Sequence, residues 1–131
     1  MNDNLISNIE FKIKFAQVIV GLSKEIIESE HMPFFERSSV SVVGIEMIEI
    51  RFEDSTLSCY FSKDTHVCKE CFLFIDNDRD VNRYKKFCDD NYTSYSNNFW
   101  VNVENKVNIQ IINDENLGEY ICFKEMKLDV N

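Results

Sequence analysis

The sequence predicts an α+β fold in which an N-terminal helix packs on an antiparallel sheet of about six strands, with a second short helix after the third strand. Three observations predict it. Apolar residues recur at helical spacing near the N-terminus, they alternate with polar residues from about residue 40 onward, and short polar turns separate the alternating segments. The 131 residues, 44% of them hydrophobic, suffice for one core. We therefore expect a single domain over residues 1–131.

The first helix is expected from residue 8 to about residue 30. Ser7 and Glu10 have the spacing of a capping box, in which each side chain bonds the other's backbone N–H. The apolar residues of this segment fall on two nearly opposite sides, which predicts burial on two sides. Residues 8–15 also alternate as a strand does, so a strand stays open there. His31-Met32-Pro33 is expected to end the helix, because the residue before a proline avoids the helical conformation.

The strands are expected after this helix. One long strand from Val40 to Phe52 changes phase near Gly44, which predicts a bulge. The other expected strands are Leu57–Ser62, Val67–Ile75, Phe99–Val103, Val107–Ile112 and Glu119–Lys127. The end of the third strand, Phe72–Ile75, is apolar on both faces and should be central in the sheet. Asp78 or Asp80 is expected to cap the short helix, which runs to about Asp89.

The charge balance is acidic and excludes several classes of function. There are 14 Lys and Arg against 23 Asp and Glu, and a net charge of −9 would repel a nucleic-acid backbone. Three Gly and one Pro leave no Gly-rich phosphate loop. The first residues lack the basic and apolar parts of a secretion signal, and no apolar run approaches the roughly 20 residues of a membrane span. We expect a cytoplasmic protein with reduced thiols that binds neither nucleic acid nor membrane.

Four residues have the side chains that zinc prefers: His66, Cys68, Cys71 and Cys88. Cys68 and Cys71 lead directly into a strand, however, where residues three apart point to opposite faces. We therefore expect buried thiols and no metal or other cofactor, with a zinc site left open as the alternative. Neither His31 nor His66 has Ser or Asp residues arranged as a recognisable triad. We expect no catalytic residues and no enzyme.

The segment 91–98 consists of Asn, Tyr, Thr and Ser without charge, and lies between Asp89-Asp90 and Phe99-Trp100. Tyr, Ser and Asn are the residues with which antibody loops contact their antigens, and Tyr and Trp dominate interface hot spots. The neighbouring carboxylates suit a basic protein partner. An ordinary exposed loop is the alternative. The residues expected to contact a partner are Asp89, Asp90, Tyr92, Tyr95 and Trp100, with Asp76, Asp78 and Asp80 at the rim.

In size, acidity and lack of catalytic residues, the whole chain resembles bacterial immunity proteins, which neutralise a nuclease or another toxin. The resemblance implies a tight complex with one basic toxin domain. In element order, residues 8–112 also resemble class I type III secretion chaperones, which implies an acidic homodimer. Residues 117–130 are expected to form a strand where those chaperones have a last helix. A monomer and a homodimer both stay open.

Overall fold

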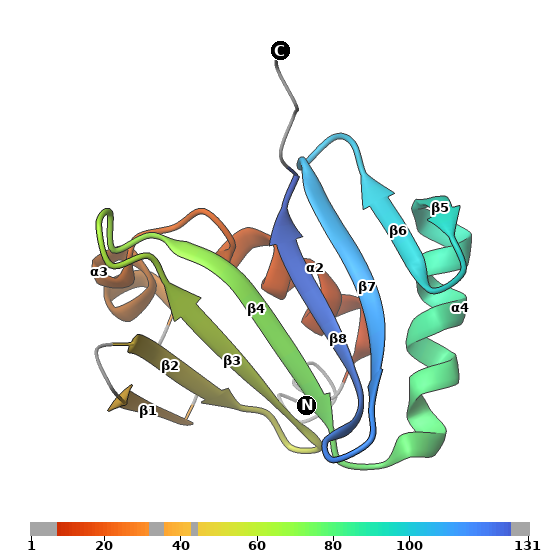
Figure 1. The fold of residues 1–131 in the computed structure, drawn as a ribbon, viewed down its shortest axis with the longest axis horizontal. Coiled ribbons are helices and arrows are strands. Elements are labelled where there is room, and N and C mark those ends of the chain that lie inside the picture. Colours follow the sequence, from red (N-terminus) through yellow and green to blue (C-terminus); the bar gives the residue numbers. More distant parts are fainter. Residues whose placement is uncertain (1–7, 32–35, 43–44, 127–131) are drawn as a thin grey trace.

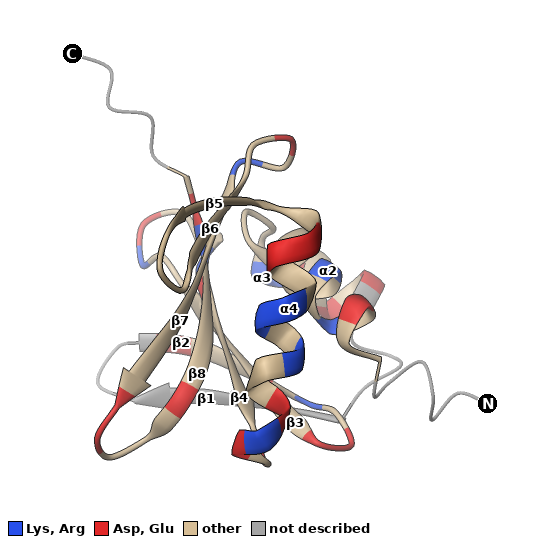
Figure 2. Ribbon diagram, turned by 90° about the vertical axis from the view of Figure 1, so that its right-hand side faces the viewer, with Lys and Arg blue, Asp and Glu red and all other residues tan. Residues whose placement is uncertain are grey.

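The computed structural model describes residues 8–31, 36–42 and 45–126. Within them the fold is α+β, as predicted, with helices on one face of an antiparallel sheet (Figures 1 and 2). The helical elements are α2 (Ile9–Ile19), α3 (Lys24–Ile26), the π-helical turn η1 (Ile27–His31), the 3-10 turn η3 (Asp78–Asp80) and α4 (Val81–Asn91). Among the described residues, no helix has the length and apolar character needed to cross a membrane.

Eight strands in the described part of the chain form one sheet in the order β1-β2-β3-β4-β8-β7-β6-β5. They are β1 (Glu36–Val42), β2 (Ile45–Arg51), β3 (Ser55–Phe61), β4 (Cys68–Ile75), β5 (Thr93–Ser96), β6 (Phe99–Asn102), β7 (Val107–Asp114) and β8 (Gly118–Glu125). All neighbouring strands are antiparallel. β1 to β4 form one meander, β5 to β8 form a second, and the two meanders pair only between β4 and β8. Because helical segments precede each meander, the second half of the fold repeats the element order of the first.

Two differences raise the number of strands above the six expected. The segment from Val40 to Phe52 is not one strand, because β1 and β2 pair with each other and Val42 lies opposite Ile45. The predicted bulge at Gly44 lies outside the described residues. In addition, Thr93–Ser96 is a strand and not a loop. Its four side chains are exposed at the edge of the sheet, so an apolar alternation is not required there.

The N-terminal segment is a helix and not the alternative strand. α2 begins after Asn8, whose side-chain oxygen accepts a hydrogen bond from the backbone N–H of Phe11 at 3.0 Å. The predicted cap, Ser7, lies outside the described residues. Helical structure ends at His31, next to the predicted stop at Pro33.

One continuous helix to residue 30 was the wrong expectation, because α2 ends at Ile19. Gly21 has a φ of +95°, which ends the helix in a conformation that L-residues with a side chain rarely adopt. The backbone N–H of Gly21 then bonds the carbonyl of Cys68 at 2.8 Å, and the N–H of Cys68 bonds the carbonyl of Leu22 at 2.8 Å. The chain therefore pairs briefly with the start of β4 before α3 begins.

The core lies between the helices and the sheet. Every second residue of the central strands faces the helices and is buried, as Leu73 and Ile75 are in β4. α2 contributes Ile13, Ala16 and Ile19, all fully buried. The central position predicted for β4 is confirmed by the strand order. The short helix is confirmed as α4, although the side chain of its N-cap residue, Asp80, makes no capping hydrogen bond.

Candidate partner-binding surface

The residues predicted to contact a partner do not form one continuous patch. Asp89 and Asp90 lie at the C-terminal end of α4, whereas Asp76, Asp78 and Asp80 lie before its first turn. Asp89 follows Asp80 by nine residue steps along α4, a rise of about 14 Å. The three N-terminal carboxylates therefore do not form a rim around the other residues.

Trp100 was expected on the surface, and this is wrong. Its side chain is 1% exposed and faces α4 in the core. The indole Nε1 donates a hydrogen bond to the Asp89 carboxylate at 2.8 Å. A buried indole needs such an acceptor, and Asp89 at the end of α4 supplies it. The hydrogen bond between Trp100 and Asp89 therefore stabilises the contact between α4 and β6.

The two tyrosines of the predicted loop differ in exposure. Tyr92 is half-buried, accepts a hydrogen bond from the Gln17 side-chain amide at 2.9 Å, and packs against the ring of Phe87. Tyr95 is 77% exposed in β5, and its ring centroid lies 5.5 Å from that of Phe99. Of the predicted aromatic residues, Tyr95 is therefore the one that is open to a partner.

Asp76 is already paired within the protein. Its two carboxylate oxygens accept hydrogen bonds from the Arg51 guanidinium at 2.5 and 3.1 Å. This contact lowers the pKa of the Asp76 carboxyl. Asp78 is exposed, and Asp80 is half-buried at the start of α4. Asp76 thus links the end of β4 to β2, and all three carboxylates lie at the opposite end of α4 from Asp89 and Asp90.

A second group of aromatic side chains lies on the outer face of the sheet, opposite the helices. The group, called here the outer aromatic cluster, consists of Tyr60 of β3, Phe72 and Phe74 of β4, and Tyr120 of β8. Phe72 is central, with ring centroids 5.2 Å from Tyr60, 5.7 Å from Tyr120 and 6.4 Å from Phe74. All four side chains are half-buried. Figure 2 shows that α2, α3 and α4 all lie on the other side of the sheet.

Sequence reasoning did not identify this cluster as a candidate site. The available signal was the run from Phe72 to Ile75, which is apolar on both faces. It was interpreted as evidence of a central strand, which is correct. A central strand whose second face has no covering helix, however, presents apolar side chains to the outside. The missing information was that both α2 and α4 pack on the same face.

Carboxylates lie next to the outer aromatic cluster. Burial raises the pKa of Tyr60, and the nearby carboxylates of Glu49 and Glu70 raise it further. Burial also raises the pKa of Tyr120, with a contribution from Asp114. Glu70 is opposite Lys124 in the sheet, and their charged atoms are 3.8 Å apart. The surface thus combines aromatic rings with carboxylates, of which Glu70 already has Lys124 as a partner.

The cluster and Tyr95 lie on the same side of the sheet. The strand register places Phe99, Gln110, Cys122 and Phe72 opposite one another in a single row across four strands. Because neighbouring strands are about 4.8 Å apart, the row from Phe99 to Phe72 is about 14 Å long. Tyr95 packs on Phe99 at the end of this row.

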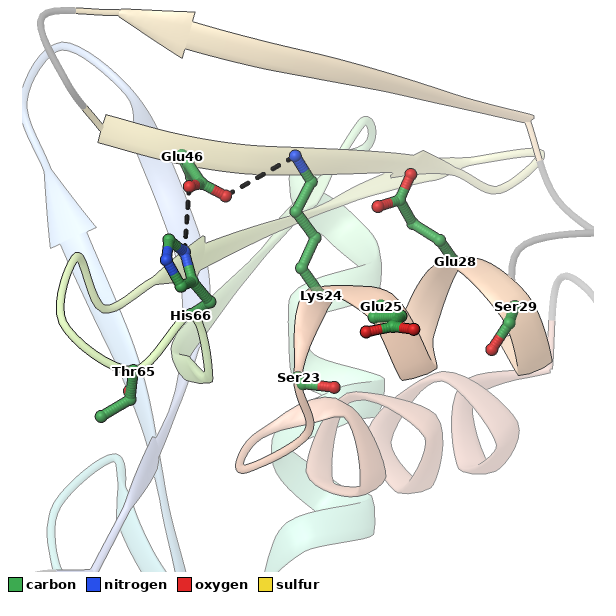
Figure 3. Close-up of a pocket in the computed structure, with 8 residues that line it drawn as sticks. All are labelled: Ser23, Lys24, Glu25, Glu28, Ser29, Glu46, Thr65 and His66. Atoms are coloured by element: carbon green, nitrogen blue, oxygen red, sulfur yellow. Dashed lines mark hydrogen bonds and ion pairs between the residues drawn. The ribbon is translucent and has the colours of Figure 1, made fainter.

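A separate polar hollow of about 800 Å³ lies between α3, the start of β2 and the turn before β4 (Figure 3). One oxygen of Glu46 is 3.1 Å from His66 Nδ1, and the other is 3.6 Å from Lys24 Nζ. Figure 3 shows Glu46 between these two partners. Glu25 and Glu28 also line the hollow. Glu46, His66 and Lys24 thus form one polar network that links α3 to the sheet, and we assign it a structural role.

The four residues of the alternative zinc site do not come together as one group. Cys68 and Cys71 are buried between β4 and α2, whereas His66 is exposed in the turn before β4 and Cys88 is buried in α4. No group of three or more His, Cys, Asp or Glu side chains in the described residues is arranged to hold a metal ion. The absence of a cofactor stays a prediction.

One detail of the zinc argument was wrong: Cys68 and Cys71 point to the same face of β4. Their sulfur atoms are 3.5 Å apart. Glu70 pairs with Tyr60 and Cys68 pairs with Phe61, so Lys69 is an additional residue without an opposite partner on β3. Such a bulge reverses the alternation and brings both thiols to the helix side.

The chain was compared with protein-family models, with curated proteins and with solved structures, and no significant match was found.

Proposed function

We propose that this chain is a binding protein without catalytic activity that captures a basic protein partner on the outer face of its sheet. The observation that carries the proposal is the outer aromatic cluster beside Glu49 and Glu70. Rings that are half-buried and held by one another offer contact area at little cost in side-chain entropy. Carboxylates around them, together with a net charge of −9, favour a positive partner and accelerate the encounter.

Within this class, we propose an immunity protein that neutralises a toxin, such as a nuclease, by tight complex formation in the bacterial cytoplasm. Nuclease domains present cationic surfaces to nucleic acid, and an acidic surface with aromatic anchors is complementary to them. The alternative is the homodimeric secretion chaperone. What favours the immunity protein is the last described element, Gly118–Glu125, which is a strand where the chaperones have a helix. In addition, each half has four strands within the described residues, whereas the chaperone order has three and two.

The proposal is tested by co-expressing the chain with the product of the gene adjacent to its own. Bacterial growth reports protection, and calorimetry on the purified pair reports affinity. Phe72→Thr and Tyr60→Thr remove rings while keeping residues that suit a strand. If these rings are anchors, each change should weaken binding by about 2 kcal/mol, roughly thirtyfold in Kd. Tyr95→Ser should weaken binding less, because Tyr95 is at the end of the surface.

The matched control is Val18→Ser, which removes an exposed apolar side chain from α2 on the opposite face, where Val18 is 51% exposed. It should leave affinity and protection unchanged. Unchanged affinity in a folded Phe72→Thr, Tyr60→Thr double variant would exclude the outer face as the binding surface. A homodimer that does not bind the adjacent product would favour the chaperone.

A further inference from the structure

Three of the five cysteines gather at one place in the core, independently of the proposed binding surface. Cys59 of β3 lies directly opposite Cys71 of β4, and Cys68 precedes Cys71 across the bulge. All three side chains are fully buried on the helix side of the sheet. The sulfur atoms of Cys68 and Cys71 are 3.5 Å apart, in van der Waals and hydrogen-bond contact.

The bulge also brings the backbone of these two residues within reach of a covalent bond. Cys68 is opposite Phe61 and Cys71 is opposite Cys59, so three steps along β4 correspond to two steps along β3. Two residues of an extended strand span about 6.6 Å, so the Cα atoms of Cys68 and Cys71 are about that far apart. Disulfides bridge Cα atoms that are about 4.4–6.8 Å apart, so this spacing is at the upper end of the permitted range. Without the bulge the two side chains would point to opposite faces.

The thiols of Cys59, Cys68 and Cys71 also differ in acidity. Hydrogen bonds with the thiols of Cys59 and Cys71 lower the pKa of Cys68. Burial raises the pKa of Cys71, and the hydrogen bond with Cys68 raises that of Cys59. These opposite shifts make Cys68 the most readily deprotonated thiol of the three. The thiolate is the nucleophilic form of cysteine.

Cys68 lies next to an exposed turn, although its own side chain is buried. Cys68 is the first residue of β4 and follows the exposed turn at Thr65 and His66. Two backbone hydrogen bonds to Gly21 and Leu22 hold it at the edge of the core. We expect local separation of this short pairing to give peroxide access to the sulfur, because it leaves the pairing of β4 with β3 and β8 in place.

We propose that Cys68 and Cys71 are an oxidation site at which hydrogen peroxide forms an intramolecular disulfide. The Cys68 thiolate attacks one peroxide oxygen, the O–O bond breaks, and hydroxide leaves, which gives a sulfenic acid. The hydroxide takes the proton of the Cys71 thiol and becomes water. The Cys71 thiolate then attacks the Cys68 sulfur, the S–S bond forms, and the second hydroxide leaves. The two sulfur atoms lose two electrons in total, and peroxide gains them.

The test is peroxide treatment of the folded protein, followed by alkylation and tryptic mapping. Each of the five cysteines lies on a different tryptic peptide, because Lys63, Lys69, Arg79, Lys86 and Lys106 separate them. The expected product has lost two hydrogens and contains peptide 64–69 linked to peptide 70–79. We expect it to form at least about tenfold faster than any change at Cys88 or Cys122, whose pKa values burial raises to about 12 and about 11.

Cysteine variants give the matched comparison. Cys68→Ser should abolish both the disulfide and the early sulfenic acid, whereas Cys71→Ser should leave a sulfenic acid on Cys68 that a dimedone probe traps. Cys88→Ser and Cys122→Ser, at buried positions outside the cluster, should change neither. A Cys59–Cys71 disulfide, equal reactivity of all five thiols, or a disulfide that forms only in urea would overturn the proposal. Mapping of the unaltered protein decides the matter even where a variant fails to fold.

Discussion

Lys12 is a lysine with a fully buried side chain. Its ammonium group pairs with the Asp54 carboxylate, donates to the Tyr84 hydroxyl at 3.1 Å, and lies 6.0 Å from the centre of the Phe52 ring. Burial raises the pKa of the Tyr84 phenol, so the hydroxyl stays neutral and can accept this bond. A buried charge is tolerated only when its partners replace the water it has lost. Lys12 thus connects α2 to the turn between β2 and β3 and to α4.

We predict that Asp54→Asn destabilises the protein by about 2 kcal/mol, because it leaves the Lys12 charge buried without a counter-ion. The loss stays below that of a fully buried pair, since the Asp54 side chain is 40% exposed. In a Lys12→Met background, where no buried charge remains, the same change should cost little. Urea unfolding of the four proteins in this double-mutant cycle measures the difference. Equal costs in both backgrounds would contradict the assigned role.

At the scale of single residues, the sequence predicted side-chain type better than side-chain direction. The buried thiols expected at Cys68, Cys71 and Cys88 are confirmed. The surface position expected for Trp100 and the opposite faces expected for Cys68 and Cys71 were wrong for a shared reason. The direction of a strand residue depends on register, and register depends on bulges and partners that composition does not encode.

At the scale of elements, Gly21 separates two helices that the sequence predicted as one. The apolar pattern continues through it, and one glycine in a helical pattern is a weak stop signal. What decides the outcome is tertiary: Gly21 and Leu22 hydrogen-bond with Cys68 of β4. Thr93–Ser96 was missed for a similar reason, since its pairing with β6 makes it a strand although its composition is that of a loop.

We predict that Gly21→Ala destabilises the protein by about 1 kcal/mol, because a side chain disfavours the left-handed backbone at this position. No atom lies within 4 Å of an added Cβ, so crowding does not contribute. The free energy of unfolding in urea measures the loss. Val18→Ala, at an exposed position of α2, is the control and should change stability by less. A gain in stability with increased helix content would show that the break is not required.

At the scale of the molecule, the fold class was predictable and the complete topology was not. The helix–strand order, the central β4 and the antiparallel turns followed from periodicity. The pairing of β4 with β8 did not, because residues about 50 positions apart carry no local signal for each other. The outer aromatic cluster depends on this pairing, since it brings Tyr120 next to Phe72 and Phe74.

We predict that residues 1–131 unfold as one cooperative unit, as a single domain requires. Trp100, the single tryptophan of the chain, is buried in the second half, so its fluorescence reports on β6 and α4. Far-UV circular dichroism reports on both halves. The two urea curves should superimpose with one midpoint. A fluorescence transition that precedes the circular-dichroism transition would show that the second meander unfolds by itself.

The junction of the two meanders has a consequence for the order of folding. Within each meander, every strand pairs with its neighbour in sequence across a short connection, so these pairs form early. Phe74 and Tyr120 come together only when the two ends of the long segment between them meet. Because bringing these ends together costs chain entropy, we expect β4–β8 pairing to be the slow step of folding. Until then, both strands are unprotected apolar edges. At high concentration, β4 of one molecule can pair with β8 of another, and two chains then exchange halves to form a dimer whose sheets have the same pairing as the monomer.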